Sequence, residues 1–156
     1  MDPKQQLAEK RKDLEWDGFF IGYTQGLGFT GHLMADEDED WGNPAFEGSG
    51  NFDDNWYVWA YLKDIISDED LTSIIEDIDG FLEQAREIIQ EDSDNDFNQA
   101  GVDFHFTRNG HGAGFWDGDW ERGDELTDMA KPYGTKELEV RWNEDGEEIM
   151  EYFLGG

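Results

Sequence analysis

The chain has 156 residues, no cysteine, and 40 Asp and Glu against 11 Lys and Arg, which gives a formal net charge of −29. This charge excludes DNA, RNA and anionic lipid as direct partners, because neutralising phosphate groups requires Lys and Arg. The lack of cysteine excludes disulfides, cysteine-ligated zinc, iron–sulfur clusters and thiol catalysis, while an aromatic content of 15% is too high for a disordered acidic tail.

The length is that of one domain, residues 1–156, which is long enough to bury a hydrophobic core. No stretch approaches the ~18 consecutive apolar residues that a membrane span needs. Residues 1–7 also contain no apolar run of the signal-peptide type. We therefore expect a cytoplasmic protein.

The N-terminal third divides into segments of different composition. Residues 1–16 are expected to form a polar helix at the periphery, with Pro3 in its first turn and Leu7 and Leu14 on one side. Residues 18–29 are apolar, aromatic and rich in glycine, and their periodicity fits a buried helix and a pair of strands equally. Residues 36–54 are expected to form an acidic, glycine-rich loop, and residues 55–62 a buried strand or short helix.

The clearest element is a helix over about residues 67–91. Ser67 is a suitable N-cap, and the three acids that follow it suit the positive end of the helix dipole. Apolar residues recur at spacings of three and four from Leu71 to Ile89. A stripe this broad is typical of a globular core. The rarer interpretation is an intermolecular coiled coil, which would make the protein a homodimer.

The C-terminal third predicts two hairpins with a helix between them. Residues 102–107 alternate between apolar and polar, Asn109-Gly110 is a typical two-residue turn, and residues 112–116 would return as the second strand. A helix is expected over residues 123–133, and a second hairpin over residues 137–142 and 147–153. The expected fold class is therefore α+β, a single domain whose antiparallel sheet of two C-terminal hairpins packs against the long amphipathic helix.

The first hairpin, residues 103–117, is a candidate binding site. Glycines at positions 112 and 114 would lie opposite Thr107 and His105 and leave bare surface beside a histidine, although glycines that mark a bulge or close packing are the more common case. No nucleophile accompanies these residues, so we expect neither catalysis nor a cofactor. His105, His111 and Asp117 include good metal ligands but lack a defined spacing, so they do not predict a metal site. The candidate binding residues are His105, Arg108, Asn109, His111, Trp116 and Asp117.

The stretch Thr-Arg-Asn-Gly-His-Gly-Ala-Gly-Phe-Trp-Asp at residues 107–117, with the downstream Leu126-Thr127 and Ala130-Lys131, resembles a family of small proteins encoded by tailed phages and related viruses. Members carry a similar stretch, then a helix and a closing hairpin. The resemblance covers residues 102–142, and residues 53–89 more loosely. The family has no settled biochemical activity. The resemblance implies a viral accessory protein that works in the cytoplasm of an infected host cell.

Two further motifs are weak. Residues 26–31 fit the pattern G-x-G-x-x-G, but neither a strand–turn–helix context nor a basic residue accompanies them, so they do not predict a nucleotide site. Residues 92–103 begin like a calcium loop, but Phe97 occupies the position of the required glycine and Asp103 that of the final glutamate. A solvated acidic loop is the favoured interpretation of this segment.

The long helix carries a row of acids with a spacing of four residues. Neighbouring like charges at this spacing cost a few tenths of a kcal/mol each, and Arg86 is the one nearby cation in the helix. Stability alone would favour lysine at some of these positions. The acids expected to form a binding surface are Asp36, Glu37, Asp38, Glu39, Asp40, Asp79, Glu83, Glu87, Glu91, Asp92, Asp94 and Asp96.

Two hypotheses explain the acidity. In the first, the carboxylates imitate the phosphates of DNA, and the protein inhibits a basic host partner such as a nucleic-acid-binding or defence protein. In the second, the protein belongs to a virus of a halophile, and its acids are an adaptation to a salty solvent that screens their repulsion. The charge would then say nothing about function, and the 103–117 hairpin would be the place to look for binding of a small ligand or a protein.

Overall fold

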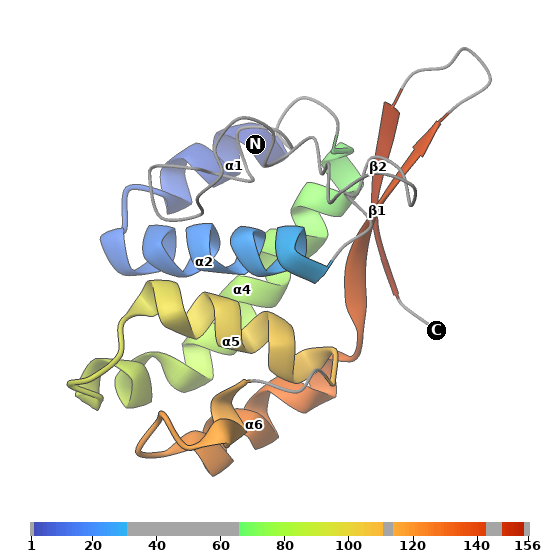
Figure 1. The fold of residues 1–156 in the computed structure, drawn as a ribbon. Helices are drawn as coiled ribbons and strands as arrows, with labels where there is room; N and C mark the ends of the chain where they lie inside the picture. Colours follow the sequence, from blue (N-terminus) through green and yellow to red (C-terminus); the bar gives the residue numbers. More distant parts are fainter. Residues whose placement is uncertain (1, 31–65, 111–113, 143–147, 155–156) are drawn as a thin grey trace, which may run out of the picture.

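The computed structural model describes residues 2–30, 66–110, 114–142 and 148–154, with the backbone alone described for residues 28–30, 117, 137–142 and 148–154. Within these ranges the protein is mainly helical, and a two-stranded antiparallel hairpin follows the helices (Figure 1). The elements are α1 (Pro3–Lys10), α2 (Leu14–Thr30), α4 (Asp68–Glu91), α5 (Phe97–Arg108), η2 (Phe115–Asp117), α6 (Gly123–Ala130), η3 (Lys131–Tyr133), β1 (Lys136–Trp142) and β2 (Glu148–Leu154).

The expected α+β fold class is wrong, because helices build the described core. The alternation over residues 102–107 predicts a strand, yet these residues are the second half of helix α5, which Asp96 caps by accepting a hydrogen bond from the Gln99 N–H. The polar residues of the alternation, Asp103, His105 and Thr107, are buried. The alternation therefore does not mark the two faces of a strand. Its polar residues are buried in the helical core, where other groups of the protein contact them.

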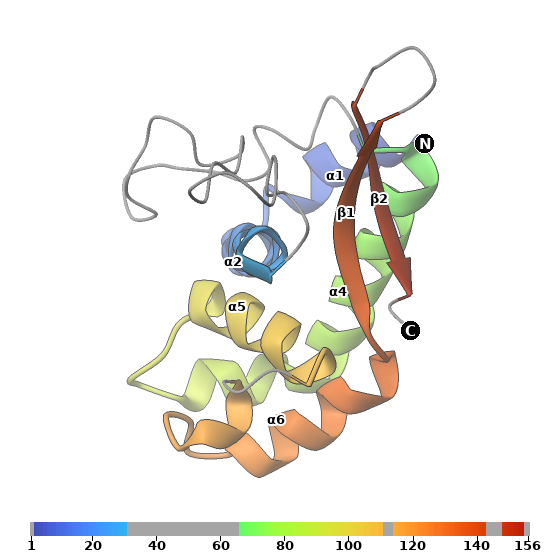
Figure 2. The same ribbon diagram turned by 45° about the vertical axis from the view of Figure 1, so that its right-hand side comes forward.

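The second expected hairpin is present close to its predicted position. Strand β1 pairs with β2 from Lys136 opposite Leu154 to Trp142 opposite Glu148. Within the described chain these two strands form a sheet of their own, and Figure 2 shows them beside α4. The predicted four-stranded sheet does not form, because residues 102–108 belong to α5.

Helix α4 confirms the long amphipathic helix. Ser67 is its N-cap, and the Ser67 hydroxyl oxygen accepts a hydrogen bond from the Asp70 N–H at 3.1 Å. The apolar stripe is buried from Leu71 to Ile89. The Phe81 ring lies 4.4 Å from that of Phe104 on α5 and 5.7 Å from that of Phe115, measured between ring centroids. An aromatic cluster thus joins α4 to the C-terminal elements.

The glycine-rich segment after residue 17 is a helix, α2, and it packs very closely against α5. A methyl group at Gly22 would overlap the backbone carbonyl of Asn98, and one at Gly101 would overlap that of Phe19. Small residues at such a contact let two helix backbones approach each other. The glycines therefore serve helix packing, and residues 26–30 of the G-x-G-x-x-G pattern lie within α2.

The N-terminal segment is two helices and not one. Helix α1 ends at Lys10, and α2 begins at Leu14. Leu7 is buried, whereas Leu14 is 84% exposed, so the two leucines do not share one side. Among the described residues, none of the helices combines the length and hydropathy that a membrane span requires.

Candidate functional site

Arg108, one of the candidate binding residues, is a buried support of the fold. Its guanidinium forms an ion pair with Asp77 of α4 at 2.9 Å and donates to the Tyr23 hydroxyl of α2 at 2.8 Å. It also donates to the backbone carbonyls of Tyr133 and Gly134. Arg108 thus ties α2, α4 and the end of η3 to α5, and its charge is not available to a ligand.

The neighbours of Arg108 in the motif also hold the chain together. The Thr107 hydroxyl oxygen accepts a hydrogen bond from the Phe115 N–H at 3.0 Å, and the Asn109 side-chain oxygen accepts one from the Lys136 N–H at 2.8 Å. His105 is fully buried and contacts Gly26 and the Tyr23 ring. The Thr-Arg-Asn triplet therefore fastens three later segments to the end of α5.

The remaining candidates of residues 103–117 are His111, Trp116 and Asp117. His111 lies outside the described residues, and Asp117 is described by its backbone in η2. Trp116, also in η2, is 50% exposed. Of the described candidates, Trp116 is therefore the one with a side chain free to meet a partner.

Two acids of residues 92–103, Asp92 and Asp103, accept hydrogen bonds from other groups of the protein. Asp92 is buried and accepts hydrogen bonds from the backbone N–H groups of Asp94 and Glu121. Burial would raise the pKa of Asp92, but these bonds and one from the Asn95 side chain outweigh it, so the pKa is lowered. Asp103 accepts from the Trp120 indole N–H at 2.7 Å. Within the described ranges, no three acids or histidines are placed to hold a metal ion.

Asp94 and Asp96 are both exposed, and Asp96 is also the N-cap of α5. The acids at positions 36–40 lie outside the described residues. In the described ranges, the expected acids with exposed side chains are therefore Glu83, Glu87 and Glu91 on α4 together with Asp94 and Asp96.

The acidic row of α4 is neutralised at its two ends. Asp79 pairs with Lys10 at 2.8 Å and accepts from the Trp16 indole N–H, and Glu91 pairs with Arg122 at 3.3 Å. Between them, Glu83 and Glu87 are exposed and have no ion pair with any described residue. The cation in the helix, Arg86, pairs instead with Asp13 and Glu15 at the start of α2.

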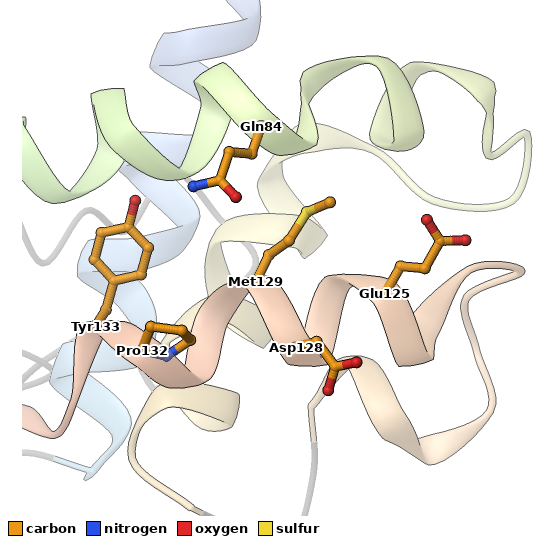
Figure 3. Close-up of a pocket in the computed structure, with 6 residues that line it drawn as sticks. All are labelled: Gln84, Glu125, Asp128, Met129, Pro132 and Tyr133. Atoms are coloured by element: carbon orange, nitrogen blue, oxygen red, sulfur yellow. The ribbon is translucent and has the colours of Figure 1, made fainter.

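A groove of about 560 Å³ lies next to this row, between α4 and the segment formed by α6 and η3. We call it the α4–α6 groove. Figure 3 shows Glu125, Met129 and Tyr133 extending toward α4, from which Gln84 reaches to meet them. The residues that line it are Gln84, Glu125, Asp128, Met129, Pro132 and Tyr133. The groove combines apolar side chains with an amide and two carboxylates.

The electrostatic environment of the groove is negative. Burial raises the pKa of Tyr133, and the nearby carboxylates of Asp77 and Glu83 raise it further against the opposing effect of Arg108. The Arg122 guanidinium donates to Glu125 at 2.8 Å and thereby lowers the pKa of that carboxyl group. Asp128 is exposed and has no ion pair with a described residue. The groove therefore offers negative charge at neutral pH.

A second hollow of about 260 Å³ adjoins the groove through Glu125, which lines both. The residues that line it include Trp116, Trp120, Glu121, Arg122 and Asp124. Apolar and acidic side chains thus follow α6 from Trp116 to Tyr133. This surface is the candidate functional site.

Sequence reasoning did not identify the residues of α6 as part of a site. Leu126 and Ala130, on the inner side of α6, are buried, and Met129 is packed against the core. This periodicity places Glu125 and Asp128 on the flanks of the helix. The periodicity of α6 does not indicate that α4 lies beside it. The groove forms only because the two helices pack side by side.

Comparisons of the chain with protein-family models, with curated proteins and with solved structures found no match.

Proposed function

We propose that the chain is a virus-encoded, non-enzymatic acidic protein that binds and inhibits a basic host protein by presenting a DNA-like negative surface. The observation that carries this proposal is a set of exposed carboxylates on α4 and the adjoining α6. We call it the acidic face. It consists of Glu83, Glu87, Glu91, Asp124, Glu125 and Asp128, of which Glu91 and Glu125 share one cation, Arg122.

The spacing within the acidic face supports imitation of a charged backbone. Glu83, Glu87 and Glu91 repeat every four residues along α4, a rise of ~6 Å. Asp124 and Asp128 repeat with the same spacing on α6. The buried side chains of Phe81 on α4 and Leu126 on α6 hold the two helices in place, so the backbone positions that carry the carboxylates are fixed before a basic partner binds.

The distribution of cations leaves this face more negative than the region around α1. There, Lys10, Arg11 and Lys12 each pair with an acid, and Arg86 turns toward the start of α2. Near the acidic face, the described cations are Arg122 and Lys131. A patch of one sign would speed association with a basic partner and make it sensitive to salt.

A nucleic-acid-binding or defence protein is the kind of partner that such a face suits, because these proteins have basic grooves for phosphates. The test is to immobilise the protein, incubate it with host lysate at low salt and elute with DNA. The proposal expects DNA to release nucleic-acid-binding proteins. If DNA releases none, the imitation of DNA is refuted.

The competing hypothesis of salt adaptation has a separate test. Far-UV circular dichroism should show a folded protein at low ionic strength if a partner is the reason for the acids. A protein that unfolds without molar salt would instead indicate an acidic surface adapted to a salty solvent.

A further inference from the structure

The α4–α6 groove and the hollow beside Trp116 form one elongated surface along α6. Glu125 lines both, and the exposed Asp128 lies at the edge of the groove. Apolar contact area comes from Met129 and Tyr133 at one end and from Trp116 at the other. An occupant of the whole surface must be extended, positively charged and able to contact apolar side chains.

Trp116 adds an observation that acidity does not explain. Imitation of phosphates and adaptation to salt both require carboxylates, and neither requires an exposed indole. Leu14 and Trp116, at 84% and 50% exposed, are the large apolar side chains exposed on the described surface. Tryptophan is enriched among the residues that contribute most to protein interfaces, and Trp116 is the one of the two that lies beside a hollow and carboxylates.

Arginine matches this combination better than any other side chain. Its planar guanidinium stacks on an indole and forms paired hydrogen bonds with a carboxylate. Its aliphatic stem can lie along apolar groups such as Met129 and Pro132. The partner of Glu125 within the chain, Arg122, is itself exposed, so an incoming guanidinium can replace it at little cost.

We propose that this surface, from Trp116 to Tyr133, binds an arginine-rich segment of the basic partner. The inference rests on the proposed function and names the chemistry by which the partner is recognised. The negative charge of the acidic face attracts the segment, and the contacts of arginine with Trp116, Glu125 and Asp128 hold it in place.

The experiment uses two synthetic peptides, one of alternating Arg and Gly and one of alternating Lys and Gly, titrated into the full chain by calorimetry at 0.15 M salt. Two variants remove site groups: Trp116→Ala, and Glu125→Gln combined with Asp128→Asn. Two controls make matched changes elsewhere: Leu14→Ala removes the other exposed apolar side chain, and Glu9→Gln combined with Glu69→Gln changes the net charge by the same amount. Circular dichroism verifies that each variant is folded.

The proposal expects the wild-type chain to bind the arginine peptide more tightly than the lysine peptide. Each site variant should lower the affinity for the arginine peptide by about 5- to 20-fold, the range expected for losing a cation–π contact or charge-assisted hydrogen bonds. Each control should change the affinity by less than about 2-fold, as is usual for exposed groups outside an interface.

Three results would overturn the proposal: no binding of the arginine peptide, equal binding of both peptides with no effect of Trp116→Ala, or equal weakening by the site and control pairs. The last result would mean that overall charge attracts the peptide. None of them refutes the proposed function, which fails if DNA releases no nucleic-acid-binding protein from the immobilised chain.

Discussion

Replacing Arg108 with Met removes a buried positive charge and keeps most of the apolar volume of the side chain. The change leaves Asp77 without its 2.9 Å ion-pair partner. It also removes the donors to the Tyr23 hydroxyl and to the carbonyls of Tyr133 and Gly134. Lys136, at 3.7 Å from Asp77, is too distant to replace the hydrogen bonds of the guanidinium.

The expected loss follows from these contacts. Breaking a buried ion pair by removing one partner costs about 3–5 kcal/mol. We expect about 3–4 kcal/mol here, because Lys136, at 3.7 Å, still offsets part of the charge of Asp77. This is a large part of the roughly 5–15 kcal/mol by which a domain is stable. With a urea dependence of about 2 kcal/mol per molar, the midpoint of unfolding should fall by about 2 M.

Urea denaturation followed by far-UV circular dichroism measures this shift, with Lys12→Met as the matched control. Lys12 pairs with Glu9 at 3.0 Å on the surface, and breaking such an exposed pair should cost less than about 1 kcal/mol. Adding Asp77→Asn to Arg108→Met should restore part of the lost stability, because it removes a carboxylate that has lost its buried guanidinium partner. If Arg108→Met costs no more than Lys12→Met, the role of Arg108 as a buried support is refuted.

Two further substitutions test the fold. Gly22→Ala should destabilise the protein by about 1–3 kcal/mol, because the added methyl group overlaps the backbone of Asn98. Gly18→Ala is the control, because its methyl group has room 3.5 Å from the Phe97 side chain. It should be neutral or stabilise the protein by up to ~1 kcal/mol. The wild-type protein should have a larger free energy of unfolding than Asp92→Asn, and this difference should be constant above about pH 4. This difference should shrink as the pH falls further through the lowered pKa of Asp92, because protonation weakens the hydrogen bonds that the carboxylate accepts from the backbone N–H groups of Asp94 and Glu121.

Urea denaturation measures both effects, the second over a series of pH values. Equal stability changes for Gly22→Ala and Gly18→Ala would contradict the close contact between α2 and α5. A difference between wild type and Asp92→Asn that grows on acidification would contradict the role of the ionised carboxylate.

Helix α4 and the hairpin of β1 and β2 could be predicted because their signals are local. Ser67 and the apolar stripe define the helix within its own residues, and polar and apolar side chains alternate over residues 137–142, which indicates the first strand of the hairpin. Helix α5 could not be predicted in this way. Its polar residues are buried because partners distant in sequence satisfy them, as Trp120 does for Asp103.

The candidate site depended still more on long-range packing. The exposed row on α4 is correctly predicted at Glu83 and Glu87, but the cations that neutralise Asp79 and Glu91 come from α1 and from the segment before α6. The groove itself requires α4 and α6 to lie side by side. Nothing in the sequence of either helix specifies that contact.

The most direct test of the acidic face compares matched variants in the capture experiment, in which each immobilised variant is incubated with host lysate and eluted with DNA. One variant carries Glu83→Gln, Glu87→Gln and Asp128→Asn on the acidic face. The control carries Glu9→Gln, Glu69→Gln and Asp68→Asn, which change the net charge equally. The wild-type chain and the control should retain nucleic-acid-binding proteins that DNA releases, and the variant of the acidic face should lose them. Equal retention by the two variants would contradict a binding role for the acidic face.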